Sequence, residues 1–294
     1  MRTREAAQVP ASLESAYREC IAIARSHYEN FSVASRLMPD DMLPHVAAIY
    51  TYCRGVDDLG DEAEGNRLAL LDEWAAQLEQ CYTGSPTEPR FLALQHTISA
   101  FDIDRQPFLD LIEANRMDQL NTRYETYEDV LYYCRHSANP VGRLYLTLIG
   151  LNDPERRELS DATCTALQLA NFWQDVKRDH AMGRIYLPQE DMRRFGYTEE
   201  ELARGEYTPA FRNLMAFQVD RTRRLFDNGL PLVDTLEDIF KLHVKLFTLG
   251  GVRVLDAIER QHYDVLSRRP TVTKARKTWL LTKTWLRMKL SRQI

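Results

Sequence analysis

The chain has 294 residues, of which 44% are hydrophobic and 28% are charged, and its formal net charge at pH 7 is −5. This composition is close to that of an average soluble globular protein and excludes a disordered polyelectrolyte. The negative balance argues against a nucleic-acid-binding protein, which would carry a basic footprint across the domain. We expect one domain over residues 1–294, because single hydrophobic cores stop growing at roughly 250–300 residues.

The five cysteines include no Cys-x-x-Cys pair, which disfavours both zinc and disulfide frameworks. Residues 1–20 lack the continuous apolar stretch of a signal peptide, and no run of about 18 uncharged apolar residues occurs anywhere. We therefore expect a cytoplasmic protein that is neither exported nor membrane-spanning.

Apolar residues recur at helical spacing along most of the chain, beginning with Leu13, Tyr17, Ile21 and Ala24. Residues 46–56 and 71–81 repeat the pattern, and strand-like alternation is scarce. The sequence therefore predicts an all-α protein. Its helices are separated by short breaks at residues 38–41, 83–89, 105–107 and 150–154.

The last of these breaks and one longer stretch carry further signals. At residues 150–154, Gly150 fits the end of one helix and Asp153-Pro154 fits the start of the next. Residues 183–209 are rich in Gly, Pro and charged residues. We expect this stretch to be an ordered loop with a short helix near the functional site.

From Arg268 onward the chain has nine Lys and Arg residues and no Asp or Glu, interleaved with apolar residues such as Trp279 and Trp285. A basic amphipathic helix of this kind binds anionic membrane surfaces. The alternative is a terminal helix that packs on the domain and leaves its basic face in water. The first interpretation predicts peripheral attachment at the inner face of the membrane.

An acidic cluster ends the amphipathic segment 48–62. If the helix continues through it, Asp57 and Asp61 are four residues apart, so both carboxylates lie on one face about 6 Å apart along the axis. Like charges at this spacing destabilise a helix unless a cation lies between them. Gly60 adds a further local cost. Such a costly arrangement favours a functional explanation.

A second cluster places Asn171, Asp175 and Asp179 at intervals of four residues, with Gln168 one turn earlier. Oxygen ligands without thiolates or clustered imidazoles select hard cations, Mg²⁺ above all. Mg²⁺ typically completes its coordination with substrate phosphates. The two clusters together predict a Mg²⁺-dependent diphosphate site.

Two arginines lie beside these clusters in the sequence. Arg54 precedes Asp57 by about one turn, and Arg184 follows the second cluster. A guanidinium group binds phosphate oxygens with a bidentate fork. Metals and arginines together stabilise the charge that develops as diphosphate leaves.

The chain resembles the trans head-to-head prenyl synthases, the family that includes squalene and phytoene synthases. The resemblance spans nearly the whole sequence, and residues 29–35, 137–143 and 171–176 look most like bacterial hydroxysqualene synthases of hopanoid pathways. It implies an isoprenoid synthase bundle of helices around a central cavity. The matching motifs are residues 27–31, 53–61, 133–142, 168–179 and 183–188.

The resemblance also implies a role for each matching residue. Tyr133 would stabilise a carbocation or handle a proton, and Asp57 and Asp175 would be central to catalysis. The diphosphate ligands would be His27, Arg54, Gln168 and Arg184. The Mg²⁺ ligands would be Asp57, Asp61, Asn171, Asp175 and Asp179.

The predicted reaction is Mg²⁺-dependent ionisation of presqualene diphosphate and capture of the cation by water, giving hydroxysqualene and diphosphate. Many relatives have small hydroxylated residues where this chain has Tyr28 and Asn30, which fits an enzyme that holds only one diphosphate. The alternative is a transferase that condenses two farnesyl or geranylgeranyl diphosphates to presqualene diphosphate, squalene or a phytoene-like product. Expected partners are the prenyl diphosphate and other enzymes of the squalene pathway.

Two alternatives from other classes are less well supported. A helical lipid- or partner-binding protein would have no reason to keep repulsive carboxylates on two helices. A di-iron protein would need two Glu-x-x-His motifs, and the chain has only residues 259–262.

Overall fold

The computed structural model describes residues 8–27 and 38–271, and within these ranges it consists of helices joined by turns and loops. An isolated bridge between Arg123 and Ile185 is the one extended pairing in the described part of the chain. The prediction of an all-α protein is confirmed. The helices are α1 (Glu14–His27), α3 (Leu43–Asp61), α4 (Arg67–Thr83), α5 (Pro89–Phe101), α6 (Gln106–Leu120), α7 (Tyr127–Ser137), α8 (Asn139–Leu148), α9 (Pro154–Ala181), α10 (Gln189–Phe195), α11 (Glu199–Ala203), α12 (Pro209–Gly229) and α13 (Asp238–Arg260), with 3₁₀ turns η1 (Ala11–Leu13) and η2 (Leu230–Thr235).

The chain divides into two compact units. The first comprises residues 1–120 and 139–157, and the second comprises residues 121–138 and 158–294. The expectation of a single domain over residues 1–294 stays a prediction. The stretch 183–209 contains two short helices, α10 and α11, where the sequence predicted one.

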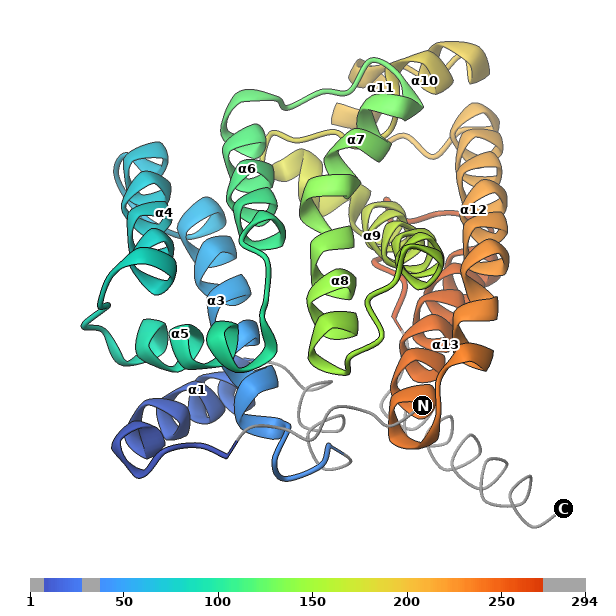
Figure 1. Cartoon of the computed structure of the whole chain (residues 1–294). Coiled ribbons are helices and arrows are strands. Elements are labelled where there is room, and N and C mark those ends of the chain that lie inside the picture. Colours follow the sequence, from blue (N-terminus) through green and yellow to red (C-terminus); the bar gives the residue numbers. More distant parts are fainter. Residues whose placement is uncertain (1–7, 28–37, 272–294) are drawn as a thin grey trace, which may run out of the picture. The chain divides into compact units, whose positions relative to one another are not determined.

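Helix α3 is at the centre of the first unit, between α4 and α6 (Figure 1). It also packs against α1, α5 and α8. The ring of Tyr52 on α3 contacts Trp74 of α4 and Phe108 of α6, with ring centroids 5.8 and 4.9 Å apart. Because α3 is held on several sides, its C-terminal acidic residues are presented from a rigid element.

A buried polar network joins α1, α3 and α5 in the same unit. The Tyr17 hydroxyl lies 2.8 Å from Nδ1 of His96, 3.3 Å from Nδ1 of His45 and 2.9 Å from Oγ1 of Thr97. It also donates to the backbone carbonyl of Ala93 at 3.1 Å. The buried His45 and the partly buried His96 are therefore hydrogen-bonded groups of the packed interior, in keeping with the rule that buried polar groups find partners.

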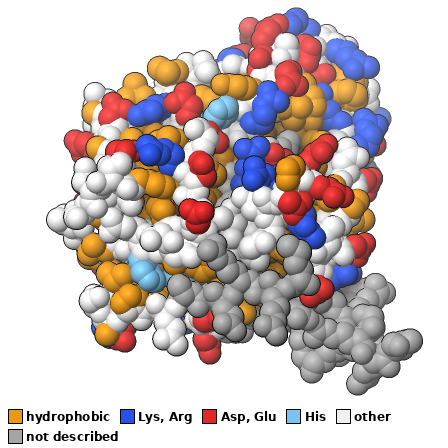
Figure 2. Space-filling view, viewed as in Figure 1, with side chains coloured by type: hydrophobic (Ala, Val, Ile, Leu, Met, Phe, Trp, Pro, Cys, Tyr) orange, Lys and Arg blue, Asp and Glu red, His pale blue; other side chains and the backbone are white. Residues whose placement is uncertain are grey.

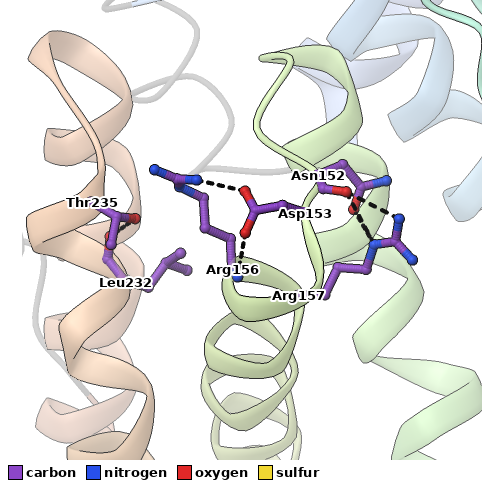
Figure 3. Close-up of polar contacts among 6 residues, drawn as sticks. All are labelled: Asn152, Asp153, Arg156, Arg157, Leu232 and Thr235. Atoms are coloured by element: carbon purple, nitrogen blue, oxygen red, sulfur yellow. Dashed lines mark hydrogen bonds and ion pairs between the residues drawn. The ribbon is translucent and has the colours of Figure 1, made fainter. Parts of the chain in front are cut away.

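Helix α9 begins where the sequence predicted a helix start. Helix α8 ends at Leu148, Gly150 has a φ of +73°, and Pro154 is the first residue of α9. Oδ1 of Asp153 accepts from the backbone N–H of Arg156 at 3.1 Å, and its Oδ2 accepts from the guanidinium of Arg156 at 2.5 Å (Figure 3). Asp153 is thus an N-cap that satisfies a free donor of the first turn.

The second unit contains the pair α12 and α13, with α10 packed on α12. Trp173 of α9 donates through Nε1 to Oγ1 of Thr222 on α12 at 2.8 Å. Arg223 of α12 pairs with Asp256 and Glu259 of α13. His262 lies beyond the end of α13 with a φ of +54°, so Glu259 and His262 do not share a helix and the di-iron alternative loses its motif.

All five cysteines lie in the described residues and are free thiols, of which Cys20, Cys81 and Cys134 are buried. No helix within residues 8–27 and 38–271 is both long enough and apolar enough to span a bilayer. Acidic and basic side chains are interspersed on the face of the molecule that Figure 2 shows.

Candidate active site

The first acidic cluster lies at the C-terminal end of α3. The helix continues through Asp61, as the sequence interpretation required, so Asp57 and Asp61 lie on one face. The last turn of a helix carries partial negative charge on its free carbonyls, which makes carboxylates there unfavourable. This end of α3 therefore favours a bound cation.

The pKa of the Asp57 carboxyl is raised by its position at the end of α3. Solvent reaches the side chain, but the protein around it reduces its hydration, and this loss raises the pKa of Asp57 to about 6. The neighbouring carboxylate of Asp61 raises the pKa further, while hydrogen bonding from Asn115 and the charge of Arg54 lower it. A divalent cation would relieve both unfavourable effects.

Asn115 of α6 completes the surroundings of this cluster. Its Nδ2 donates to the backbone carbonyl of Leu111 at 3.1 Å and makes a longer contact of 3.4 Å with Oδ1 of Asp57. A Cβ on Gly60 would lie 1.9 Å from Oδ1 of Asn115. The glycine that seemed costly in the helix is therefore explained by the close approach of α6.

Arg54 lies one turn before Asp57 and pairs with acidic residues at the C-terminal end of α3. Its Nη2 pairs with Oδ1 of Asp58 at 2.6 Å and with Oε1 of Glu62 at 3.0 Å. These contacts hold the guanidinium near the end of the helix. Its predicted role as a diphosphate ligand requires exchange of at least one carboxylate partner for a phosphate oxygen.

The second acidic cluster lies on the last three turns of α9. Leu169, Phe172, Trp173 and Val176 are buried on one side of the helix. Asn171 is exposed, whereas Gln168, Asp175 and Asp179 are partly exposed. Asp179 again lies in the last turn of a helix, where a carboxylate is unfavourable without a cation.

Asp175 pairs with an arginine that follows α13. Nε of Arg269 donates to Oδ1 of Asp175, and Nη2 donates to Oδ2 at 2.9 Å, which is a bidentate fork. Nη2 also donates to Oε1 of Gln174 at 3.1 Å. Asp175 is thus already neutralised by a cation from the chain itself.

Arg184 is held at the end of α9 by the turn that follows. Gly183 has a φ of +85°, and the backbone N–H of Arg184 donates to the carbonyl of Asp179 at 2.9 Å. Ile185 N donates to the carbonyl of Thr122 at 2.9 Å. Arg184 is a buried residue, 9% exposed. The structure thus ties the backbone of Arg184 to that of the predicted metal ligand Asp179.

Tyr133 lies in a cluster of buried aromatic rings in the second unit. Its ring centroid is 5.5 Å from that of Tyr186, 5.7 Å from that of Tyr124 and 5.9 Å from that of Phe172. Phe172 and Tyr186 are stacked, with centroids 3.8 Å apart and planes 5° apart. Such rings offer π surface, which stabilises a cation.

The structure brings together the predicted residues of each unit. Asp57, Asp61 and Arg54 share the end of α3, and His27 is the last residue of α1. Gln168, Asn171, Asp175 and Asp179 share α9. Tyr28 and Asn30 lie outside the described residues, as does the basic segment beyond residue 271. In the described part of the chain, no three His, Cys, Asp or Glu side chains form a group that could hold a metal ion.

Sequence reasoning missed two residues that contact the predicted metal ligands. Asn115 lies on the same helix face as the buried residues Phe108, Leu111 and Ile112. A polar residue at an apolar position of the pattern was the signal that could have revealed it. Arg269 had no local signal, because 94 positions of sequence separate it from Asp175.

The comparison with protein families identifies the class. A family model described as squalene/phytoene synthase matches residues 24–276. The chain therefore belongs to the squalene/phytoene synthase family.

Curated relatives and solved structures agree with this assignment. The chain is 35% identical to the 15-cis-phytoene synthase of Synechococcus elongatus over 291 residues, covering 94% of each chain. It is 31% identical to the chloroplastic phytoene synthase 2 of Solanum lycopersicum over 274 residues, covering 90% of this chain and 88% of the relative.

Among solved structures, the squalene synthase HpnC from Alicyclobacillus acidocaldarius is 47% identical, with a TM-score of 0.84, covering 87% of this chain and 97% of that one. A dehydrosqualene synthase solved with a ligand is 26% identical, with a TM-score of 0.85, covering 95% of this chain and 98% of that one. These similarities confirm the isoprenoid synthase helical fold predicted from the sequence.

Proposed function

We propose that this protein is a hydroxysqualene synthase that ionises presqualene diphosphate in the presence of Mg²⁺. The bond between carbon and the diphosphate oxygen breaks, diphosphate leaves with the electron pair, and water adds to the rearranged carbocation and loses a proton. The observation that carries the proposal is the resemblance of residues 137–143 and 171–176 to hydroxysqualene synthases. The 47% identity to the squalene synthase HpnC, compared with 35% to the phytoene synthase of Synechococcus elongatus, supports a squalene-type enzyme over a phytoene-type one.

The donor chemistry of both clusters suits Mg²⁺. Asp57 and Asp61 on α3, and Asn171, Asp175 and Asp179 on α9, supply only carboxylate and amide oxygens. Mg²⁺ is usually held by one or two carboxylates together with water and phosphate oxygens. When bound, it neutralises the charge that builds up on the departing diphosphate.

The other residues would act on the substrate directly. Arg54 and Arg184 would hold phosphate oxygens with their guanidinium groups, assisted by Gln168 and His27. Tyr133 would stabilise the carbocation, and the packed rings around it would keep its orientation fixed. Burial of this aromatic cluster would also limit where water reaches the cation.

A second candidate function is condensation of two prenyl diphosphates. One observation favours it. The curated relatives from Synechococcus elongatus and Solanum lycopersicum, whose matches cover 94% and 90% of this chain, are named phytoene synthases. Such an enzyme would consume farnesyl or geranylgeranyl diphosphate and would have to hold two diphosphate groups.

Product analysis separates the two functions. Purified protein and Mg²⁺ are incubated separately with presqualene, farnesyl and geranylgeranyl diphosphates, and the products are identified by gas chromatography and mass spectrometry. Hydroxysqualene from presqualene diphosphate, with the other two substrates unconsumed, is the expected result. Consumption of farnesyl or geranylgeranyl diphosphate would contradict the proposal and establish a condensing synthase.

We also propose that the basic segment from residue 268 attaches the enzyme to anionic membranes, where its apolar products partition. Nine Lys and Arg residues without any Asp or Glu support this proposal. Deletion of the residues after Arg269 should weaken sedimentation with anionic liposomes, most strongly at low salt. Equal sedimentation of both proteins would show that the segment does not bind membranes.

A further inference from the structure

The ion pair between Arg269 and Asp175 is more than a chance surface contact. Both carboxylate oxygens of Asp175 accept from the same guanidinium, and the carboxylate is only 15% exposed. A bidentate fork fixes geometry as well as charge. The nearby carboxylate of Asp179 adds further attraction for Arg269.

A second anchor holds the same stretch of chain on α9. Nε2 of Gln174 donates to the backbone carbonyl of Pro270 at 2.6 Å, while its Oε1 accepts from Arg269. Both amide atoms of a buried glutamine are therefore used to hold residues 269–270. The guanidinium is thus positioned by its neighbours and does not depend on the attraction to Asp175 alone.

This geometry conflicts with direct metal coordination by Asp175. The Nε–H and Nη2–H groups of Arg269 each occupy a lone pair on one carboxylate oxygen of Asp175. The guanidinium therefore covers the edge of the carboxylate that it faces. A cation that binds the same oxygens must either push the guanidinium aside or accept strong repulsion from its charge. Arg269 and a metal ion are therefore alternative partners for one carboxylate.

We propose that Arg269 is a positioning residue that acts as the resident counter-ion of Asp175 and is displaced when metal binds there. The proposal rests on the proposed role of Asp175 as a metal ligand. The arginine keeps the carboxylate neutralised and oriented, and it lowers the affinity of the second cluster for free metal.

Metal affinity in the absence of substrate tests this inference. Mn²⁺ is titrated into the full-length protein, and the free ion is measured by electron paramagnetic resonance. We expect Arg269→Gln to bind Mn²⁺ about fivefold to tenfold more tightly than the unaltered chain. Arg269→Lys keeps the positive charge but loses the bidentate fork, so we expect its Mn²⁺ affinity to be intermediate. If Arg269→Gln does not fold, Arg269→Lys is used in its place.

Two controls distinguish displacement from a general charge effect. Arg268→Gln removes the same charge one position earlier, from an arginine whose Nη2 lies 3.4 Å from the amide oxygen of Gln261, and it should leave the affinity nearly unchanged. In an Asp175→Asn background, the gain from Arg269→Gln should disappear. No gain in Arg269→Gln, an equal gain in Arg268→Gln, or a gain that persists without Asp175 would overturn the inference. Because no prenyl substrate is used, the result does not depend on which reaction the enzyme catalyses.

Discussion

Asn115 of α6 lies against Gly60 of α3, so that a Cβ on the glycine would meet its Oδ1 at 1.9 Å. The same amide group reaches Asp57 through Nδ2 at 3.4 Å. Gln119, one turn further along α6, donates to the carbonyl of Gly60 at 3.0 Å. The position of the first acidic cluster is thus set by a close helix crossing that only glycine permits.

Gly60→Ala should destabilise the protein by about 1–3 kcal/mol, because Asn115 must move and its contacts with Asp57 and Leu111 weaken. Gly250 in α13 is the matched control, since a Cβ there meets nothing within 4 Å. Gly250→Ala should be neutral or stabilising by up to about 1 kcal/mol through helix propensity. Urea unfolding of both variants measures the difference, and equal stabilities would contradict the packing explanation.

If the proposed metal site is right, Asp57→Asn and Asp175→Asn should each lower turnover by on the order of 10²–10³ or more, since each would remove a charged ligand for the metal. Helical circular dichroism should stay nearly unchanged. The control substitutions are Asp72→Asn on α4 and Asp161→Asn on α9, which lie outside the two clusters. Turnover by either cluster variant at the level of these controls would refute the proposed metal site.

The buried His243 should make stability depend on pH. Burial lowers its pKa to about 4, below the unfolded value of about 6.5. The folded state therefore binds fewer protons than the unfolded state between these values, and stability is full above pH 6.5 and is lost as the pH falls towards 4. From pH 8 to pH 5 this loss is at most about 2 kcal/mol.

Urea unfolding at the two pH values measures this effect. His243→Gln should remove most of the loss attributed to this residue. His262→Asn, at an exposed position, should retain the loss seen in the unaltered chain. An identical pH dependence in all three proteins would show that His243 does not contribute.

The buried pair of Arg221 and Asp191 should matter for stability. Nη2 of Arg221 lies 2.6 Å from Oδ2 of Asp191, with the side chains only 11% and 6% exposed. Asp191→Asn leaves a buried guanidinium without a counter-charge, and we expect a loss of about 3 kcal/mol. Asp220→Asn, which removes an exposed i,i+4 pair with Arg224, should cost less than about 0.5 kcal/mol. Chemical unfolding tests both, and similar losses would contradict the role of burial.

Local sequence patterns predicted much of the helical structure. The periodicity of Leu13, Tyr17, Ile21 and Ala24 corresponds to η1 and α1. The Asp153-Pro154 signal corresponds to the start of α9. Both depend on chemistry within a few residues, such as capping and amphipathic spacing. The second short helix, α11, was missed, although Thr198 and Glu201 form a capping box at its start.

Long-range contacts could not be predicted in the same way. The approach of Asn115 to Gly60 depends on how α6 crosses α3, and the pairing of Arg269 with Asp175 depends on where the chain goes after α13. Neither the crossing of α6 over α3 nor the path of the chain after α13 leaves a periodic pattern in the sequence. The carboxylates themselves were found because two acidic residues four positions apart are unfavourable on any helix.

The buried cysteines have a consequence for how the folded chain reacts. Burial raises the pKa of Cys20 to about 11 and that of Cys81 to about 12, and it also raises the pKa of Cys134. A thiol that is shielded and protonated is not alkylated until the structure around it opens. Cys20 and Cys81 belong to the first unit and Cys134 to the second. The rates at which these thiols are modified in the native protein therefore report separately how often each unit opens.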